Sequence, residues 1–241
     1  MDIWYPYFGD QLKLALTSHE SADVTAAEAF ASATPTAQAV YEDIVAEAAE
    51  KSGLPHESQV ATEWLDLGAV GALQRQLSWL TARSDLDEWV IANIFRDVAV
   101  YLDDLQVRDA VLQCVLETVP DTGELVLVSH GLGTVVAMDL MTRLSPGVDL
   151  VHLTTAGSPL GLESVYSRLL IGGPKRPKVV TDWLNAWCPT DAVTIGCPLH
   201  DHWEFGATDI AVANARDRAH SIEEYLSHAE VARPIGSGLA G

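Results

Sequence analysis

The stretch LVSHGLGTVVA, residues 127–137, decides the fold. An apolar, β-branched run ends at Ser129, a tight turn follows at Gly131, and a helical sequence begins directly behind it. Small residues stand two positions before and two positions after Gly131, at Ser129 and Gly133, so that a strand and a helix can pass closely. The pattern predicts a strand, a strained turn and a helix, with residue 131 displayed at the apex of the turn.

The sequence on either side predicts an α/β fold. We expect strands at 124–129, 149–155 and 179–187, and a helix at 134–144 that ends before Pro146. Strands that alternate with helices across short turns form a mostly parallel sheet with helices on both faces. Since 241 residues suit one domain, we predict a single domain over residues 1–241.

The part of the chain from residue 36 to residue 118 is expected to be mostly helical. Pro35 and Gly53 bound an expected helix at 36–52, and residues 54–118 read as helix after helix, a cap-like insertion before the first strand. Ser84 is the expected N-cap of one of them. Its apolar face carries Ile91, Ile94, Phe95, Val98, Tyr101 and Leu102 at helical spacing. That face suits either core packing or a helical roof over an apolar pocket.

The stretch 127–137 resembles the nucleophile elbow, G-x-S-x-G, of the α/β-hydrolase fold, in particular of bacterial lipase- and esterase-like members. The resemblance implies an α/β-hydrolase-like fold of the serine hydrolase type, but Gly131 stands where the family has its serine. A glycine-rich phosphate cradle is the alternative reading of the turn. It would need glycine at position 136, which is Val136, and no Gly-Lys-Ser/Thr follows.

The resemblance also implies an acid and a base, in the chain order nucleophile, acid, base. Asp191 follows the expected strand 179–187, and His220 precedes a C-terminal helix. His220 would be the general base, and Asp191 would hold its tautomer. Sequence alone leaves competitors, which are the carboxylates of Asp182, Asp201 and Asp209 and the imidazoles of His200, His202 and His228.

Further site residues follow from the same resemblance. The backbone N–H of Leu132, the residue after the nucleophile position, would donate to an oxyanion. A second N–H would come from a loop near the N-terminus, for which residues 8–10 are a candidate. The turn at 156–161 is similar to one that these enzymes carry after the next strand. A substrate pocket is therefore expected to include His130, Ser158, Pro159 and Trp187.

Composition excludes several classes of function. Lys and Arg total 14 against 34 Asp and Glu, a net charge of −20 that repels nucleic acids and anionic lipid. No apolar run reaches the ~18 residues of a membrane span, and no signal peptide is recognisable. Three cysteines make no disulfide framework. We expect a cytoplasmic protein without cofactor or metal, and the sequence leaves its oligomeric state open.

The expected function is that of a serine esterase or lipase acting on carboxylic esters or related acyl substrates. With Gly131 in place of the nucleophile, acyl-enzyme chemistry is lost or strongly reduced, since loss of such a nucleophile costs on the order of 10⁶ in turnover. Direct activation of water by His220 is a second possibility. The alternative class is a non-catalytic pseudo-hydrolase that binds a small apolar ligand or a protein partner.

Overall fold

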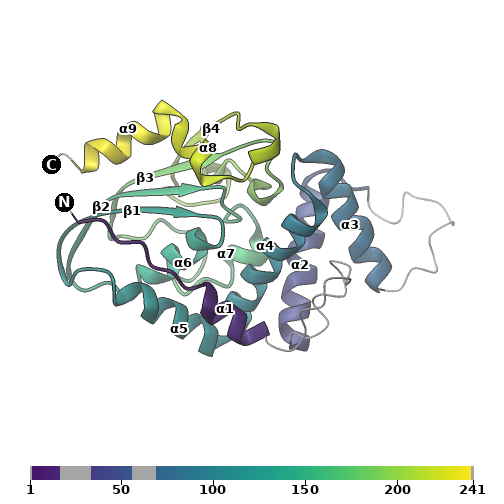
Figure 1. The fold of residues 1–241 in the computed structure, drawn as a ribbon, viewed down its shortest axis with the longest axis horizontal. Coiled ribbons are helices and arrows are strands. Elements are labelled where there is room, and N and C mark those ends of the chain that lie inside the picture. Colours follow the sequence, from purple (N-terminus) through teal and green to yellow (C-terminus); the bar gives the residue numbers. More distant parts are fainter. Residues whose placement is uncertain (1, 17–33, 56–68, 240–241) are drawn as a thin grey trace.

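A computed structural model describes residues 2–16, 34–55 and 69–239 of the chain, and its sheet confirms the α/β prediction (Figure 1). Four parallel strands lie in the order β1-β2-β3-β4. They are β1 (Thr122–His130), β2 (Gly147–Ala156), β3 (Val180–Trp187) and β4 (Thr208–Ala211). The first three lie within two residues of the predicted ranges at their ends, and β4 was not predicted. Because the strands are parallel, the loops that follow them meet at one edge of the sheet.

Helices surround the sheet. In the described part of the chain, five of them precede β1, and they are α1 (Gly9–Leu16), α2 (Pro35–Lys51), α3 (Ala69–Arg83), α4 (Glu88–Asp103) and α5 (Leu105–Leu116). The connections and the C-terminal part hold α6 (Leu132–Leu140), α7 (Glu163–Tyr166), α8 (Ile222–Ser227) and α9 (Ala229–Gly238), with 3-10 turns η2 (Ala192–Thr194), η3 (Leu199–Asp201) and η4 (Arg216–Arg218). In Figure 1, α6 lies below the sheet and α9 above it. Helices therefore cover both faces, as expected.

The helical region before the sheet agrees with the sequence in kind and differs in detail. Helix α2 begins at Pro35, and Thr34 caps it by accepting a hydrogen bond from the backbone N–H of Ala37. Helix α4 begins at Glu88 with Asp87 at the N-cap position, so the prediction that Ser84 is the N-cap is wrong. The hydroxyl of Ser84 accepts from Leu86 N–H within the preceding turn instead. Of the predicted region 54–118, residues 56–68 lie outside the described residues.

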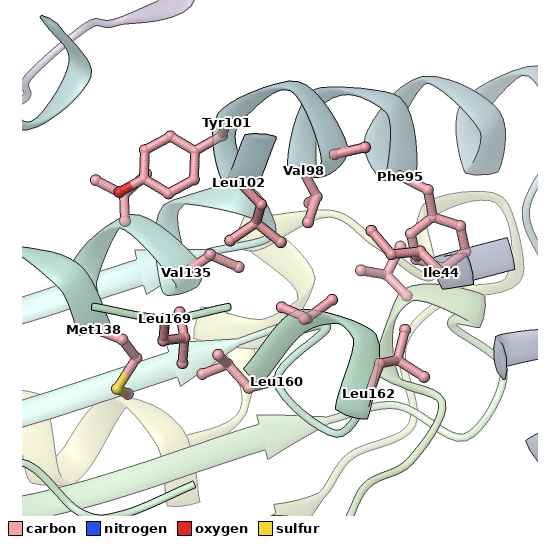
Figure 2. Packing of buried hydrophobic residues seen from close by; sticks show 14 of the residues in the cluster. Ile44, Phe95, Val98, Tyr101, Leu102, Val135, Met138, Leu160, Leu162 and Leu169 are labelled. Atoms are coloured by element: carbon pink, nitrogen blue, oxygen red, sulfur yellow. The ribbon is translucent and has the colours of Figure 1, made fainter. Parts of the chain in front are cut away.

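The apolar face of α4 packs into the core. Five of its six predicted residues are buried, and Ile94 is partly buried against the same cluster. Figure 2 shows Phe95, Val98 and Leu102 of α4 facing apolar side chains from α2, α6 and the segment around α7. One continuous apolar cluster thus joins the helical region to the sheet, and core packing explains this face.

A buried ion pair fixes the carboxyl-terminal half of α6 to the helical region. The carboxylate of Asp139 is fully buried and accepts two bonds from the guanidinium of Arg108 on α5, with Nε at 2.7 Å. It also accepts from the hydroxyl of Tyr101 at 3.0 Å and from the backbone N–H of Leu170 at 2.7 Å. Burial raises the pKa of Tyr101, and the neighbouring Asp139 carboxylate adds to that shift, so the phenol stays a neutral donor.

We expect Asp139→Asn to destabilise the protein by about 3–5 kcal/mol, because the variant leaves the Arg108 charge buried without its counter-ion. Urea unfolding followed by circular dichroism measures the change. Asp109→Asn is the matched control: Asp109 pairs with Arg143 at the surface with 64% of its side chain exposed, and it should cost at most about 1 kcal/mol. Equal losses in the two variants would contradict the role given to Asp139.

Candidate active site

The turn between β1 and α6 has the strained geometry that the sequence predicts. Gly131 has φ 53° and ψ −126°, in a region of backbone space that L-residues with side chains rarely occupy. Its N–H donates to the carbonyl of Ala156 at the end of β2. Helix α6 begins at the next residue, Leu132, so the backbone N–H groups of Leu132 and Gly133 have no acceptor inside the helix, whereas that of Thr134 donates to the carbonyl of Gly131.

Two buried hydroxyls lock this turn. Thr134 Oγ1 lies 2.7 Å from the carbonyl oxygen of Gly131, which can only accept, so the Thr134 hydroxyl donates there. Ser158 Oγ lies 2.7 Å from Thr134 Oγ1. Because the one proton of Thr134 is used, Ser158 must be the donor of that second bond. Ser158 also accepts from the backbone N–H of Leu160.

These bonds explain why Ser158, a residue predicted to line the substrate pocket, is buried behind the turn. Its side chain is fully buried and its hydroxyl is engaged on both sides. Its neighbour Pro159 is buried as well. Ser158 supports the turn from behind, and Ser129 is equally occupied, since its hydroxyl donates to the carbonyl of Thr154. Neither serine is presented as a substitute nucleophile.

The predicted acid and base are in contact. Asp191 Oδ2 lies 2.8 Å from His220 Nδ1, although 28 residues separate them in the chain. Asp191 is buried at the start of η2, on the loop that follows β3, and His220 lies between η4 and α8. Since a carboxylate only accepts, it holds the proton of His220 on Nδ1, which leaves Nε2 of the neutral ring as a base.

The Asp191 carboxylate has two further donors that the sequence did not reveal. Tyr225 on α8 donates its hydroxyl to the same oxygen, Oδ2, at 2.7 Å, and the backbone N–H of Val193 donates to Oδ1 at 3.0 Å. Burial raises the pKa of Tyr225, and the Asp191 charge raises it further, so the phenol donates and stays neutral. Together with His220, these groups satisfy the buried carboxylate.

His220 is aimed at residue 131. A Cβ atom built on Gly131 would lie 3.2 Å from His220 Nε2 and 3.6 Å from Cε1. Apart from the flanking residues of the chain, no other heavy atom lies within 4 Å of that position. The basic nitrogen of the acid–base pair therefore faces the place where a side chain of residue 131 would begin.

The other candidate acids and bases form pairs elsewhere. Asp182 accepts a hydrogen bond from His152 Nδ1 at 2.7 Å, and the second nitrogen of that ring lies 2.8 Å from the buried hydroxyl of Thr154. Asp209 pairs with the exposed ring of His200 at 3.0 Å, which also lies near Asp201. His228 contacts the side-chain oxygen of Asn214, and His202 is exposed. Among the pairs of the described residues, Asp191–His220 is the one that meets the turn at Gly131.

His130, a predicted pocket residue, packs against His220. The centroids of the His130 and His220 rings are 4.3 Å apart. Burial, and then the proximity of His220, lower the pKa of His130 from 6.5 to about 4. Gly157, with φ 57°, lies beside both rings: a Cβ there would come within 3.0 Å of His130 and 3.1 Å of His220. Position 157 must therefore be glycine for both imidazoles to fit.

The helical region reaches the loops that carry the acid and the base. The backbone N–H of Asp85, between α3 and α4, donates to the carbonyl of Thr190, the residue before Asp191. The Asp85 carboxylate also pairs with Arg216 of η4 at 2.8 Å. Trp187, the last predicted pocket residue, ends β3 and is half-buried. The candidate N-terminal loop is different: Gly9 begins α1, which packs against α4 and α5.

Comparison of the chain with models of known families, with curated proteins and with solved structures gives no match in any of the three. The described residues contain no group of three or more His, Cys, Asp or Glu side chains arranged to hold a metal ion. None of the helices in the described part of the chain is long and apolar enough to cross a membrane.

We expect Thr134→Val to cost about 1–3 kcal/mol, because it leaves the buried Ser158 proton without an acceptor. Urea unfolding measures the loss. The double variant Thr134→Val with Ser158→Ala removes both partners and should be destabilised by less than the sum of the two single variants. Simple addition of the two losses would show that the hydroxyls are not coupled.

The low pKa of His130 makes stability depend on pH. Between pH 6.5 and about 4 the unfolded chain takes up a proton at His130 that the folded protein does not. The free energy of unfolding should therefore fall as the pH falls through this window, with a contribution of up to about 1.4 kcal/mol per pH unit. His130→Asn should remove this contribution. Urea unfolding at a series of pH values tests it, with the exposed His202→Asn as a control that keeps the parent slope.

Proposed function

We propose that the chain is an α/β-hydrolase-like protein of the serine esterase or lipase type, whose site acts on carboxylic esters or related acyl groups. Gly131 stands at the nucleophile position, so acyl-enzyme chemistry is lost or strongly reduced. The observation that carries the proposal is the distance of 3.2 Å between a Cβ built on Gly131 and Nε2 of the Asp191-held His220.

Three features support this assignment. The turn at residue 131 has the positive φ of a displayed apex residue. The base is oriented by a buried carboxylate, which is the arrangement that activates a hydroxyl nucleophile. Leu132, the first residue of α6, directly follows Gly131 at the end of the sheet that carries Asp191 and His220, and its backbone N–H suits a developing oxyanion. A small apolar ester is the ligand we propose, and the cytoplasm, where cysteines such as the free Cys114, Cys188 and Cys197 stay reduced, is the setting.

Gly131→Ser should create esterase activity on p-nitrophenyl acetate, with kcat/KM at least about 10²-fold above that of the parent. The bonds that hold the turn would keep the serine displayed at a strained positive φ, and the His220 ring would have to move by a few tenths of an ångström to admit the new Cβ. A fluorophosphonate reagent should label the introduced serine, as detected by intact-protein mass spectrometry.

The control is the double variant Gly131→Ser with His220→Ala, which should lose both the activity and the rapid labelling because the hydroxyl then has no base. If the serine variant binds esters without hydrolysing them, the proposal fails and the site belongs to the alternative class, a pseudo-hydrolase that binds an apolar ligand or a partner.

A further inference from the structure

We propose that this chain, as it stands, hydrolyses activated esters by direct attack of water, without an acyl-enzyme, with the water taking the place of the missing side chain at residue 131 and His220 acting as its general base. The inference rests on the proposed function for its substrate class. Beyond the proposed function, it identifies water as the nucleophile and states that no covalent intermediate forms between substrate and enzyme.

The room for the water follows from the glycine. The Cβ position of residue 131 is bounded within 4 Å only by two atoms of the His220 ring, besides the adjoining residues of the chain. A serine would place its hydroxyl one bond beyond that position. A water oxygen in the same place can come within the 2.6–3.2 Å or so at which a base accepts a proton.

His220 is held in the orientation needed to accept this proton. Asp191 holds the other ring nitrogen, and Tyr225 and Val193 fix the carboxylate in turn, so the orientation of His220 does not depend on residue 131. His130 packs on the same ring from a second side. Its pKa of about 4 keeps it uncharged at neutral pH, so it does not repel the imidazolium that forms during the reaction.

The reaction balances without any further reagent. The water oxygen forms a bond to the acyl carbon while His220 Nε2 takes one water proton. The tetrahedral intermediate then collapses, the bond from the acyl carbon to the leaving oxygen breaks, and the imidazolium returns the proton to that oxygen. The products are a carboxylic acid and an alcohol or phenol, and the enzyme is unchanged.

Two substitutions test the position of the water beside residue 131 and the role of His220 as the general base. His220→Ala should lower kcat/KM for p-nitrophenyl acetate by roughly 10²-fold. Gly131→Ala should lower it by about tenfold or more, because its methyl group would lie 3.2 Å from Nε2 and only one bond length from the water position, which excludes the water. Gly123→Ala is the matched control: Gly123 also has a positive φ, of 106°, and lies in β1, the strand that precedes Gly131, with nothing within 4 Å of its Cβ position. It should keep the parent activity. Thermal unfolding curves check that each variant is folded.

The water route has signatures of its own. The parent should show no burst of p-nitrophenol and no fluorophosphonate adduct, whereas Gly131→Ser shows both. Hydroxylamine, a small nucleophile that fits the same place, should yield the hydroxamate with the parent and much less with Gly131→Ala.

The outcomes separate the two proposals. Parent activity equal to that of His220→Ala, or unchanged in a folded Gly131→Ala, overturns the water route, and an adduct or burst in the parent overturns it too. If Gly131→Ser is active while the parent is not, the proposed function stands and this inference alone fails. If neither the parent nor Gly131→Ser hydrolyses the ester, both proposals fail.

Discussion

The site depends on one constraint, the positive φ of Gly131 at the point where β1 becomes α6. With this turn, the chain reverses from strand to helix within one residue. The turn is held from two directions, by the Gly131 N–H on the carbonyl of Ala156 and by the Thr134 hydroxyl on the carbonyl of Gly131. A looser turn would move the first N–H groups of α6 and the base-facing position together, so the geometry of both follows from this one residue.

The parallel sheet then places the remaining groups. The loops after β1, β2 and β3 leave the same edge, and they carry Gly131, Gly157 and Asp191 respectively. Helix α6 is fixed at both ends, by Thr134 in its first turn and by the buried carboxylate of Asp139 in its last. Because Asp139 binds α4 and α5 as well, the helical region stabilises the helix that begins at the site.

The sequence predicts those features whose signals are local. The strand–turn–helix around Gly131, the first three strands and the start of α2 each carry a continuous pattern. The prediction missed β4, which has four residues without a buried apolar run, and α9, whose interior contains Pro234 and glycine. The prediction that Ser84 caps α4 was wrong. Ser84 and Asp87 are both residues that favour the N-cap position, and the sequence does not show at which of them the helix begins.

Within the site, the sequence predicted Asp191 and His220 through their order in the chain, and missed Tyr225 and Gly157. Nothing near Tyr225 in the sequence marks its hydroxyl, because its partner Asp191 lies 34 residues earlier. Gly157 is required because the rings of His130 and His220, which come from two other segments of the chain, lie against it. No pattern in the sequence around residue 157 indicates these contacts. Ser158 was expected to line the pocket and instead supports the turn, since a hydroxyl in a loop has the same sequence signal in either role.

Among the described residues, three histidines lie against aspartates, and they differ in what surrounds the ring. His152 lies beside α9, and its Nε2, the nitrogen that does not face Asp182, is already bonded to the buried hydroxyl of Thr154. The His200 side chain is 61% exposed, and its two ring nitrogens lie near Asp209 and Asp201. His220 combines a buried acid with a nitrogen that faces a glycine rather than a partner. A base is useful when its orientation is fixed and its acceptor site is open, and in the described part of the chain His220 alone among these three has both properties.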